Sequence, residues 1–405
     1  MDKENKNPNV PNLRFSDYND SLKNICLSEL LSFQNGINAD SDKYGKGIKY
    51  ISVGDIINND YITYDCIKGK VDISQKELNN YLVENGDILF QRSSETFEDI
   101  GNANVYLDEQ PCTFGGFVIR GKKIGEYDPK YLNYLLKSPN ARKQVIRLGA
   151  GAQHYNINQE SLNKIILSFP SAKEQAKISQ FLTKIEEQIQ LQNKIIEVKR
   201  LLKDLIIDNC IFKSNDCEYV EVCNFADLKN GYAFKSNNYT DCGKYKVITI
   251  GNVSGERYLN LNKLNYLTYI PLDIQKHQIL KKGDLLISLT GNVGRISICN
   301  EENCLLNQRV GLIELFNVND YEYLYQVMAS KRFQNDMVLR AQGAAQPNIG
   351  KDDVLNYSIP YLNNLNKRKK ISSVLRLLDN SILSDENLLI TYNKQKQYLL
   401  RNLFI

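Results

Sequence analysis

The chain has 405 residues and a formal net charge of +4, with 42% hydrophobic and 24% charged residues. This length exceeds one ordinary domain and predicts two or three, and the composition excludes a disordered chain. The small positive charge leaves a nucleic-acid partner open, since basic residues can gather on one face of a molecule.

The N-terminal part begins with a polar tail and continues as a mixed domain. Residues 1–13 are rich in Asn, Asp, Lys and Pro, which predicts a flexible tail. Residues 14–170 contain short apolar runs between polar residues and glycine turns, such as YISVGDI at 50–56 and NGDILFQR at 85–92. This alternation predicts β-strands in a first domain.

A long helix is predicted over residues 171–212, which contain neither Gly nor Pro. Ser171 and Glu174 have the spacing of an N-terminal capping box. A second apolar stripe, from Leu191 through Val198 to Leu205, continues the helical spacing. The first stripe has one polar position and predicts a seam for a partner helix; its residues are Ile178, Leu182, Ile185, Ile189, Gln192 and Ile196.

The second half repeats the first in order, which indicates an internal duplication. Gly251 follows Gly54 by 197 positions, and Gly283 follows Gly86 by the same number. The matching stretches are IKYISVGDI (48–56) with KYKVITIGNV (244–253), ENGDILFQ (84–91) with KKGDLLIS (281–288), and GAQHYNI (151–157) with GAAQPNI (343–349).

The duplication predicts a second domain over residues 213–362 and a second long helix over 363–405. The seam of this helix lies 193 positions after the first and keeps a polar residue at the same place; it comprises Ile371, Leu375, Leu378, Ile382, Asp385 and Leu389.

The two helices most simply pack on each other as an antiparallel coiled coil with a pseudo-two-fold axis. We therefore expect a mixed α+β fold, with two repeated α/β domains separated by two long helices. Each helix would span roughly 50 to 60 Å. Successive turns of duplex DNA lie roughly 34 to 36 Å apart, so two such domains suit DNA if DNA is the partner.

Four features together point to a known family. They are VPNLRFSDYNDSLKNICLSEL at 10–30, the doubled Gly-Asp strand with TGNVGR (290–295) after its second copy, the doubled Gly/Ala…Asn-Ile turn, and a strand ending in proline before each helix (Pro170 and Pro360). Each motif alone is weak evidence. In this duplicated order, over almost the whole chain, they resemble the specificity (S) subunit of a type I restriction-modification system.

The resemblance implies that each domain is a target recognition domain that reads half of a bipartite DNA sequence. The helices would set the spacing and dock two methyltransferase (M) subunits, which carry S-adenosylmethionine and methylate adenine. Two restriction (R) subunits, which use ATP and Mg, join where such a system has them. The chain itself would bind double-stranded DNA, hold no cofactor and catalyse nothing.

Candidate DNA-binding residues lie beside the glycine turns. Arginine reads guanine and Asn or Gln reads adenine, whereas Ser and Thr contact the DNA backbone. Arg92 and Arg295 are favoured because each follows the doubled Gly-Asp strand; a turn cap or a solvated side chain is the alternative for any one residue. The full set is Arg92, Ser93, Ser94, Gln153, His154, Tyr155, Thr290, Asn292, Arg295 and Gln346.

The repeated turn favours architecture at its shared positions and recognition at its unshared ones. Asn156 and Asn348 recur, which favours a structural corner. The unshared pairs, His154-Tyr155 and Gln346-Pro347, are candidates for distinguishing two different half-sites, so we expect an asymmetric target. The basic run at 366–370 is either a solvated helix start or a contact with DNA or an acidic partner.

The sequence lacks the signatures of an enzyme. It contains no Pro-Pro pair, which the adenine-methyltransferase motif needs, and no G-x-x-x-x-G-K-[ST] phosphate loop. Nine cysteines without a CxxC pair and two histidines argue against zinc, so no metal is expected. Without a signal peptide or a long apolar run, a cytoplasmic protein is expected. The alternatives are a coiled-coil scaffold without sequence-specific DNA binding and a fused restriction-modification enzyme.

Overall fold

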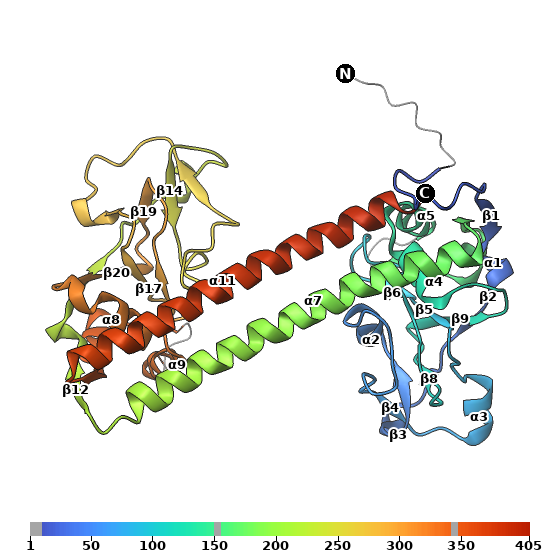
Figure 1. Cartoon of the computed structure of the whole chain (residues 1–405), viewed down its shortest axis with the longest axis horizontal. Helices are drawn as coiled ribbons and strands as arrows, with labels where there is room; N and C mark the ends of the chain where they lie inside the picture. Colours follow the sequence, from blue (N-terminus) through green and yellow to red (C-terminus); the bar gives the residue numbers. More distant parts are fainter. Residues whose placement is uncertain (1–9, 150–154, 342–346) are drawn as a thin grey trace. The chain divides into compact units, whose positions relative to one another are not determined.

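The computed structural model describes residues 10–149, 155–341 and 347–405. Contacts group the chain into unit 1, residues 1–192 and 388–405, and unit 2, residues 193–387. Each unit holds one mixed domain, here called module 1 (14–170) or module 2 (213–362). Each unit also holds a segment of two long helices, α7 (Ala172–Ile207) and α11 (Leu365–Asn402), which are drawn in green and red in Figure 1.

Module 1 is built on an antiparallel four-stranded sheet. Its strand order is β2 (Leu31–Asn35), β9 (Val118–Lys123), β5 (Ile88–Gln91) and β7 (Ala103–Val105). A three-stranded sheet follows the order β4 (Lys70–Val71), β3 (Tyr44–Ile51) and β8 (Thr113–Phe114). Two short pairs join β1 (Lys23–Cys26) to β11 (Ile166–Phe169) and β6 (Ser93–Ser94) to β10 (Tyr155–Asn156).

In the described residues of module 1, six short α-helices accompany the sheets. They are α1 (Leu27–Leu30), α2 (Val53–Ile57), α3 (Gln75–Asn80), α4 (Pro129–Lys137), α5 (Pro139–Leu148) and α6 (Gln159–Asn163). Asp128 and Ser138 cap α4 and α5 by accepting the backbone N–H groups of Tyr131 and Ala141, and each helix starts with proline at its first position. The local sequence therefore defines where both helices begin.

Module 2 repeats this plan. The sheet order is β13 (Ala226–Asn230), β20 (Val310–Leu315), β17 (Leu285–Ser288) and β18 (Ile296–Ile298). A second sheet has the order β15 (Asn265–Leu267), β14 (Tyr245–Ile248), β19 (Cys304–Leu306) and β16 (Ile279–Leu280), and β12 (Cys217–Glu221) pairs with β21 (Ser358–Leu362). Its helices are α8 (Tyr321–Met328), α9 (Lys331–Arg340) and α10 (Lys351–Leu355).

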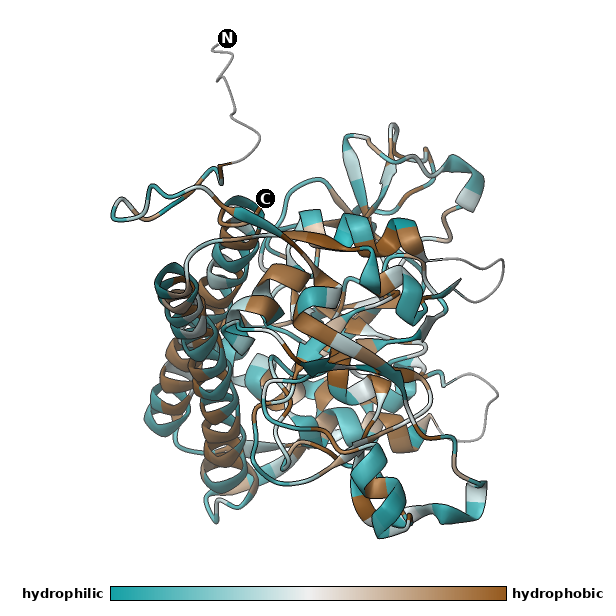
Figure 2. Cartoon of the chain, turned by 90° about the vertical axis from the view of Figure 1, so that its right-hand side faces the viewer, coloured by the Kyte–Doolittle hydropathy of each residue, from teal (hydrophilic) through white to brown (hydrophobic). Residues whose placement is uncertain are grey.

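The main sheet of each module separates two hydrophobic cores. In β5, Ile88 and Phe90 face the core that includes α4, whereas Leu89 faces the core of the smaller sheet. In β17, Leu285 and Ile287 likewise face α8, and Leu286 faces the other core. Side chains of successive strand residues point to opposite faces, so a fully apolar strand indicates burial on both sides. Figure 2 shows hydrophobic segments in brown inside the module and hydrophilic turns in teal on its outside.

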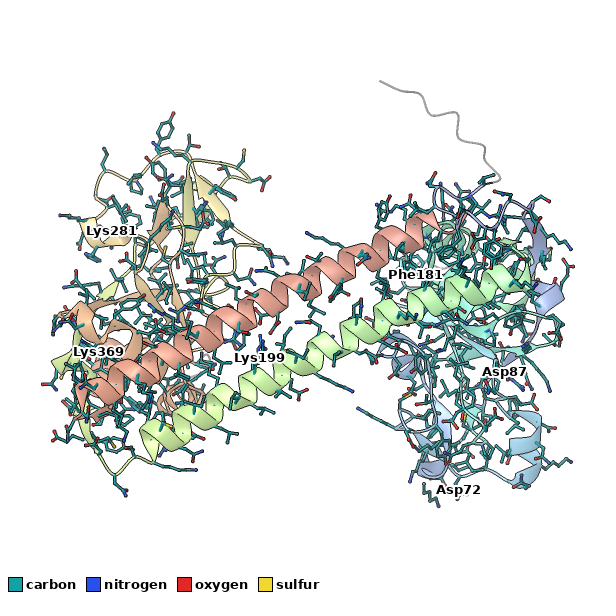
Figure 3. The ribbon with its side chains drawn as sticks, in the orientation of Figure 1. Asp72, Asp87, Phe181, Lys199, Lys281 and Lys369 are labelled. Atoms are coloured by element: carbon teal, nitrogen blue, oxygen red, sulfur yellow. The ribbon has the colours of Figure 1, made fainter. Side chains whose placement is uncertain are left out.

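The helices run antiparallel within each unit. In unit 2, Lys199 Nζ lies 2.5 Å from Asp385 Oδ2, and Lys203 Nζ lies 2.6 Å from Asp379 Oδ1. Residue numbers therefore rise along α7 in the direction in which they fall along α11. Lys199 is labelled on α7 in Figure 3. In unit 1, Lys396 Nζ lies 2.6 Å from Glu186 Oε1. Two repeated domains and an antiparallel helix pair agree with the expected fold class.

The predicted seam residues are all buried or half-buried. Ile178, Leu182 and Ile185 belong to the core of module 1, and Leu375 belongs to the core of module 2. The first stripe of each helix therefore packs on a module as well as on the other helix. The second stripe is different, because Leu191, Val198, Leu202 and Leu205 are 59%, 63%, 47% and 56% exposed.

Candidate nucleic-acid interface

The doubled Gly-Asp motif forms a tight turn that starts β5 and β17. Gly86 and Gly283 have φ angles of +91° and +95°, a region that favours glycine. The carboxylate of Asp87, labelled in Figure 3, accepts the backbone N–H of Glu84 at 2.9 Å, and that of Asp284 accepts the N–H of Lys281 at 2.7 Å. Burial raises the pKa of Asp284. The Gly-Asp motif therefore has a structural role, which is to form the turn before each strand.

Asn156 and Asn348, the repeated asparagines, each lie in a corner of the backbone just after the end of β5 or β17. Ser93 pairs with Asn156 between β6 and β10, and the Ser93 hydroxyl donates to Asn156 Oδ1 at 2.5 Å. In module 2, Thr290 forms the equivalent bridge with Asn348. The N–H of Ile157 donates to the carbonyl of Arg92 at 3.0 Å, as that of Ile349 does to Leu289 at 2.9 Å. Shared asparagines thus occupy the same place in both corners.

These pairings place the two favoured arginines at different positions of the repeat. The residue that matches Arg92 is Leu289, and Arg295 lies further along, beyond the following turn. Arg92 is half-buried, and its Nη1 donates to the carbonyl of Gly116 at 3.2 Å. Arg295 is half-buried as well; its N–H donates to Ser288 Oγ and its carbonyl accepts the N–H of Ser288, both at 3.0 Å. The two arginines are therefore not equivalent candidates.

The other candidates divide between the corner and its surroundings. Ser94 is buried and accepts the N–H of Thr96 at 3.1 Å, so it has a structural role. The ring of Tyr155 packs edge-on against Phe97, with centroids 5.1 Å apart. Asn292 is exposed, and its carbonyl accepts the hydroxyl of Ser288. Gln153, His154 and Gln346 lie outside the described residues.

The corner also identifies an exposed position that the sequence comparison missed. The N–H of Arg92 donates to the carbonyl of Phe117 at 2.8 Å, and the N–H of Leu289 donates to that of Arg309 at 3.0 Å. Phe117 is 69% exposed, and Arg309 is exposed as well. An alignment of FGGFV (114–118) with LNQRV (306–310) at an offset of 192 would have found this pair.

Module 1 has a hollow at Phe117, and module 2 has one at Tyr232, whose carbonyl accepts the N–H of Gln308. The hollow in module 1 has a volume of about 470 Å³ and is lined by Asn38, Tyr44, Tyr50, Ser52, Gly116 and Phe117. The hollow in module 2, of about 480 Å³, is lined by Tyr232, Phe234, Lys235, Asn238, Tyr269 and Pro271. Tyr269 is 82% exposed. Aromatic rings and amides are groups that can contact DNA bases by stacking and hydrogen bonding.

Only some side chains of the basic run at the start of α11 are exposed. Arg368 is buried, donates to the carbonyl of Leu362 and lies 3.2 Å from Asp320 Oδ1. Lys367 Nζ donates to Ser214 Oγ at 3.0 Å. Lys369 and Lys370 are exposed. A test of partner binding by charge reversal therefore belongs at Lys369 and Lys370, because reversal at Arg368 would disrupt the module.

No helix in the described ranges is both long and apolar enough to span a membrane. Within the same ranges, no three His, Cys, Asp or Glu residues are arranged to hold a metal ion.

Comparisons with known proteins agree on one family. The profile of the type I restriction modification DNA specificity domain matches residues 19–200 and 215–392. The chain is 26% identical over 349 residues to the type I restriction enzyme MjaVIII specificity subunit of Methanocaldococcus jannaschii, covering 80% of this chain and 79% of that one. It is 25% identical over 388 residues to the putative MjaX specificity subunit of the same organism, covering 88% and 86%.

A solved structure has a similar fold. The type I restriction-modification S subunit from M. genitalium matches with a TM-score of 0.63 and 16% identity, covering 98% of this chain and 99% of that one.

Proposed function

Because the chain belongs to the family of type I restriction-modification specificity subunits, we propose that it is the DNA-reading subunit of such a complex. Modules 1 and 2 would be the two target recognition domains, and each would read one half of a bipartite target. Subunits of this family work with DNA and with methyltransferase and restriction subunits. We propose that this chain itself catalyses no reaction.

The observation that carries the proposal is the duplicated module with unlike exposed residues at matching positions. Phe117 and Arg309 occupy equivalent places beside equivalent corners. Arginine can donate two hydrogen bonds to guanine, whereas phenylalanine makes apolar contacts such as that with the methyl group of thymine. Two different side chains at one repeated position favour an asymmetric target.

The exposed apolar face of α7 supports docking of protein partners. Val198, Leu201, Leu202 and Leu205 lie within two turns of this helix and are 47% to 63% exposed. Exposed apolar side chains gathered in this way are typical of a protein interface. We propose that methyltransferase subunits cover this face, and that the duplication provides for two of them. Restriction subunits would join where the system has them.

The cofactors would belong to the partners. S-adenosylmethionine would be held by the methyltransferase subunits, and ATP with Mg by the restriction subunits. We propose that this chain binds none of them. Isothermal titration of the purified chain with each cofactor tests this point, and binding at micromolar concentrations would contradict it.

The function is tested by adenine-methylation sequencing of a host that carries the complete system. The expected result is one methylated motif made of two unlike half-sites separated by a fixed spacer. A continuous or perfectly palindromic motif would contradict the proposal for two different readers. A host that lacks only this chain should lose the methylation.

A gel shift of the chain with its methyltransferase partner tests the alternative of a scaffold without DNA reading. Specific binding should weaken steeply with salt, because phosphate contacts release counterions. Equal affinity for target and non-target DNA at every salt concentration would favour the scaffold.

A further inference from the structure

Both modules are joined to the long helices by equivalent clusters of charged residues. In each unit, one helix provides a carboxylate and the other a lysine. They are Glu186 and Lys396 in unit 1, and Asp379 and Lys203 in unit 2. Asp379 follows Glu186 by 193 positions, as Lys396 follows Lys203. The duplication has therefore preserved one acid–lysine pair in each unit.

Each module adds one residue to its pair from the same loop. In module 1 this residue is Asp60, whose Oδ1 lies 3.3 Å from Lys396 Nζ. In module 2 it is Arg257, whose Nη1 lies 3.0 Å from Asp379 Oδ2. The preceding residues mark the loops as equivalent, because the carbonyl of Asn59 accepts Asn104 Nδ2 and that of Glu256 accepts Ser297 Oγ. The two modules thus use opposite charges at one repeated position.

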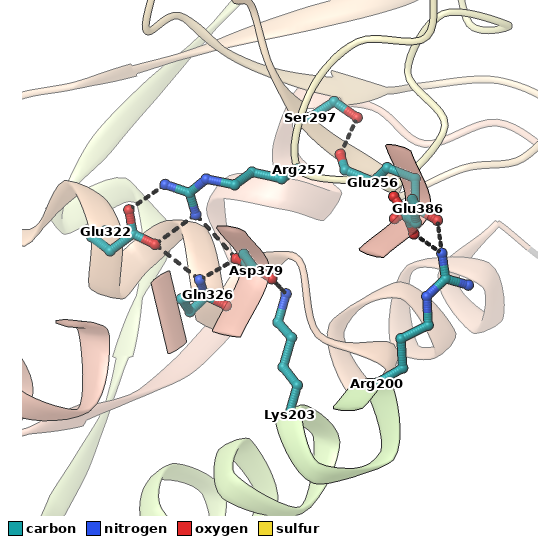
Figure 4. A network of polar contacts seen from close by, with 9 residues as sticks. All are labelled: Arg200, Lys203, Glu256, Arg257, Ser297, Glu322, Gln326, Asp379 and Glu386. Atoms are coloured by element: carbon teal, nitrogen blue, oxygen red, sulfur yellow. Dashed lines mark hydrogen bonds and ion pairs between the residues drawn. The ribbon is translucent and has the colours of Figure 1, made fainter. Parts of the chain in front are cut away.

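The contacts of Arg257 are extensive (Figure 4). Nη1 and Nη2 donate to the two carboxylate oxygens of Glu322 on α8, at 2.8 and 2.7 Å. Gln326 Nε2, also on α8, donates to Asp379 Oδ2 at 2.7 Å. The guanidinium carbon lies 4.9 Å from the centre of the Tyr325 ring. Such a two-pronged arginine contact fixes direction as well as distance.

The contacts of Asp60 are the counterpart. Gln190 Nε2 on α7 donates to Asp60 Oδ2 at 2.9 Å. From α4, Asn133 Nδ2 and Lys137 Nζ donate to the carbonyl of Asp60 at 3.1 and 2.9 Å. Asn133 precedes Gln326 by 193 positions. Side chains of α4 therefore hold the loop through the carbonyl of Asp60, whereas those of α8 hold the loop through Arg257 and the helix through Asp379.

The charges of each cluster balance. Asp60 and Glu186 oppose Lys396 and Lys137 in unit 1, whereas Arg257 and Lys203 oppose Asp379 and Glu322 in unit 2. Glu186 and Asp379 are 4% and 6% exposed. Buried ion pairs are weak evidence for stability, and fixing one arrangement among alternatives is a role they can have.

We infer that Asp60 and Arg257 are positioning residues, which hold each recognition module at one orientation on its helix segments and thereby fix the spacing of the two half-sites. The inference about spacing rests on the proposed function. The inference that these residues hold the module does not, and it can be measured without DNA.

The first experiment follows amide hydrogen exchange in the full chain alone. Arg257→Ala should increase exchange in residues 255–258 and in α8. Arg257→Lys should have a smaller but measurable effect, because lysine keeps the positive charge and lacks the two-pronged geometry. Lys246→Ala removes an ion pair with Glu301 inside module 2 and serves as the matched control. Unchanged exchange in both Arg257 variants would overturn the inference, whether or not the chain reads DNA.

The second experiment uses the complex with its methyltransferase subunits. Methylation rates are compared on the natural target and on targets whose spacer is one base pair longer or shorter. Arg257→Ala should reduce the preference for the natural spacer by about tenfold, since small errors in position have large effects on rate. A uniform loss of rate on all spacers, with an unchanged preference, would mean a merely structural role and overturn the inference.

A charge exchange separates the module contact from the helix contact. Asp379→Lys with Lys203→Asp keeps an acid–lysine pair between the helices but removes the carboxylate that faces Arg257. The double variant should lose its preference for the natural spacer length, as Arg257→Ala does. Retention of the natural preference would overturn the role of Arg257. If the unmodified complex methylates no bipartite target, the proposed function fails. The amide hydrogen exchange of the Arg257 variants still decides whether Arg257 holds the module.

Discussion

The two copies of the Gly-Asp turn bind their carboxylates in different ways, and Asp87 is buried whereas Asp284 is half-buried. In module 1, Arg120 Nε lies 2.6 Å from Asp87 Oδ2, and these side chains are 5% and 1% exposed. In module 2 the matching strand position is Leu312, which pairs with Leu286 as Arg120 pairs with Leu89. Asp284 therefore lacks an arginine, and burial raises its pKa. One repeated motif thus tolerates both a carboxylate paired with an arginine and a carboxylate held by the backbone N–H of Lys281.

Arg120→Leu would give module 1 the residue that module 2 has. It should lower the free energy of unfolding by about 3 kcal/mol, because Asp87 would remain buried without its guanidinium. Urea unfolding of the full chain measures this, with Lys122→Leu as a control, since Lys122 is 49% exposed and pairs only at the surface. A loss equal to that of the control would contradict the explanation.

The buried amine of Lys137 should make the stability of the chain depend on pH in the alkaline range. Burial lowers its pKa from 10.5 to about 8. Between these values the unfolded chain binds a proton that the folded chain has released, so this group makes stability rise from pH 8 to pH 10.5. Below pH 8 its charge costs up to about 3 kcal/mol. Lys137→Met, which also removes the hydrogen bond from Nζ to the Asp60 carbonyl, should therefore reduce the rise in stability above pH 8.

The measurement for Lys137 is the difference between the two chains at each pH, because other groups titrate in both. Unfolding by urea at pH 7, 9 and 10 gives the three points needed. A difference that stays constant over this range would contradict a lowered pKa.

At the scale of elements, the first residues of each module are tied to a long helix by a charge pair, and the signs of the two charges are reversed between the units. Arg14 makes two hydrogen bonds of 2.8 Å to the carboxylate of Glu174 on α7. In unit 2, Lys367 on α11 lies 3.8 Å from Asp216. Lys367 follows Glu174 by 193 positions, so the helix carries the anion in one unit and the cation in the other. Both units thus have a pair of opposite charges at this contact, but the helix and the module have exchanged the signs of their charges.

The exposed face of α7 predicts an effect on assembly that is separate from folding. Val198→Asp with Leu202→Asp should leave unfolding within about 1 kcal/mol of the parent, since both side chains are largely solvent-exposed. Co-purification with the methyltransferase subunit should be lost. Leu272→Asp, in an exposed loop of module 2, is the matched control. Normal co-purification of the double variant would place the docking surface elsewhere.

The sequence predicted long-range order better than local contacts. The helix limits and the repeat followed from periodicity, because α7 and α11 must bury one stripe each. The roles of single residues did not follow. Ser171 Oγ accepts the N–H of Glu174 at 3.4 Å as the capping box predicts, yet the carboxylate of Glu174 binds Arg14. Arg368 looks like a surface residue but is buried. Partners outside the helix decide such contacts, Arg14 at 160 positions from Glu174 and Asp320 at 48 positions from Arg368, and the periodicity of the helix carries no information about them.

At the scale of the whole molecule, the duplication separates what builds the fold from what can read DNA. Positions that recur, such as Asn156 and Asn348, form the same corner in both modules. Positions that differ while remaining exposed are free to determine recognition. The equivalence of Phe117 and Arg309 became visible only through the backbone contacts that place each beside its corner.

This separation predicts that one substitution in each module affects one half-site. Arg309→Ala should lower discrimination at one half of the target by about 1–3 kcal/mol, the range for an arginine that reads guanine. Phe117→Ala should affect the other half. The measurement is the methylation rate on targets that carry single base changes in either half, and Lys282→Ala provides an exposed cation of module 2 as control. Equal loss at both halves would mean that these residues act on the complex as a whole, and that the modules do not read independently.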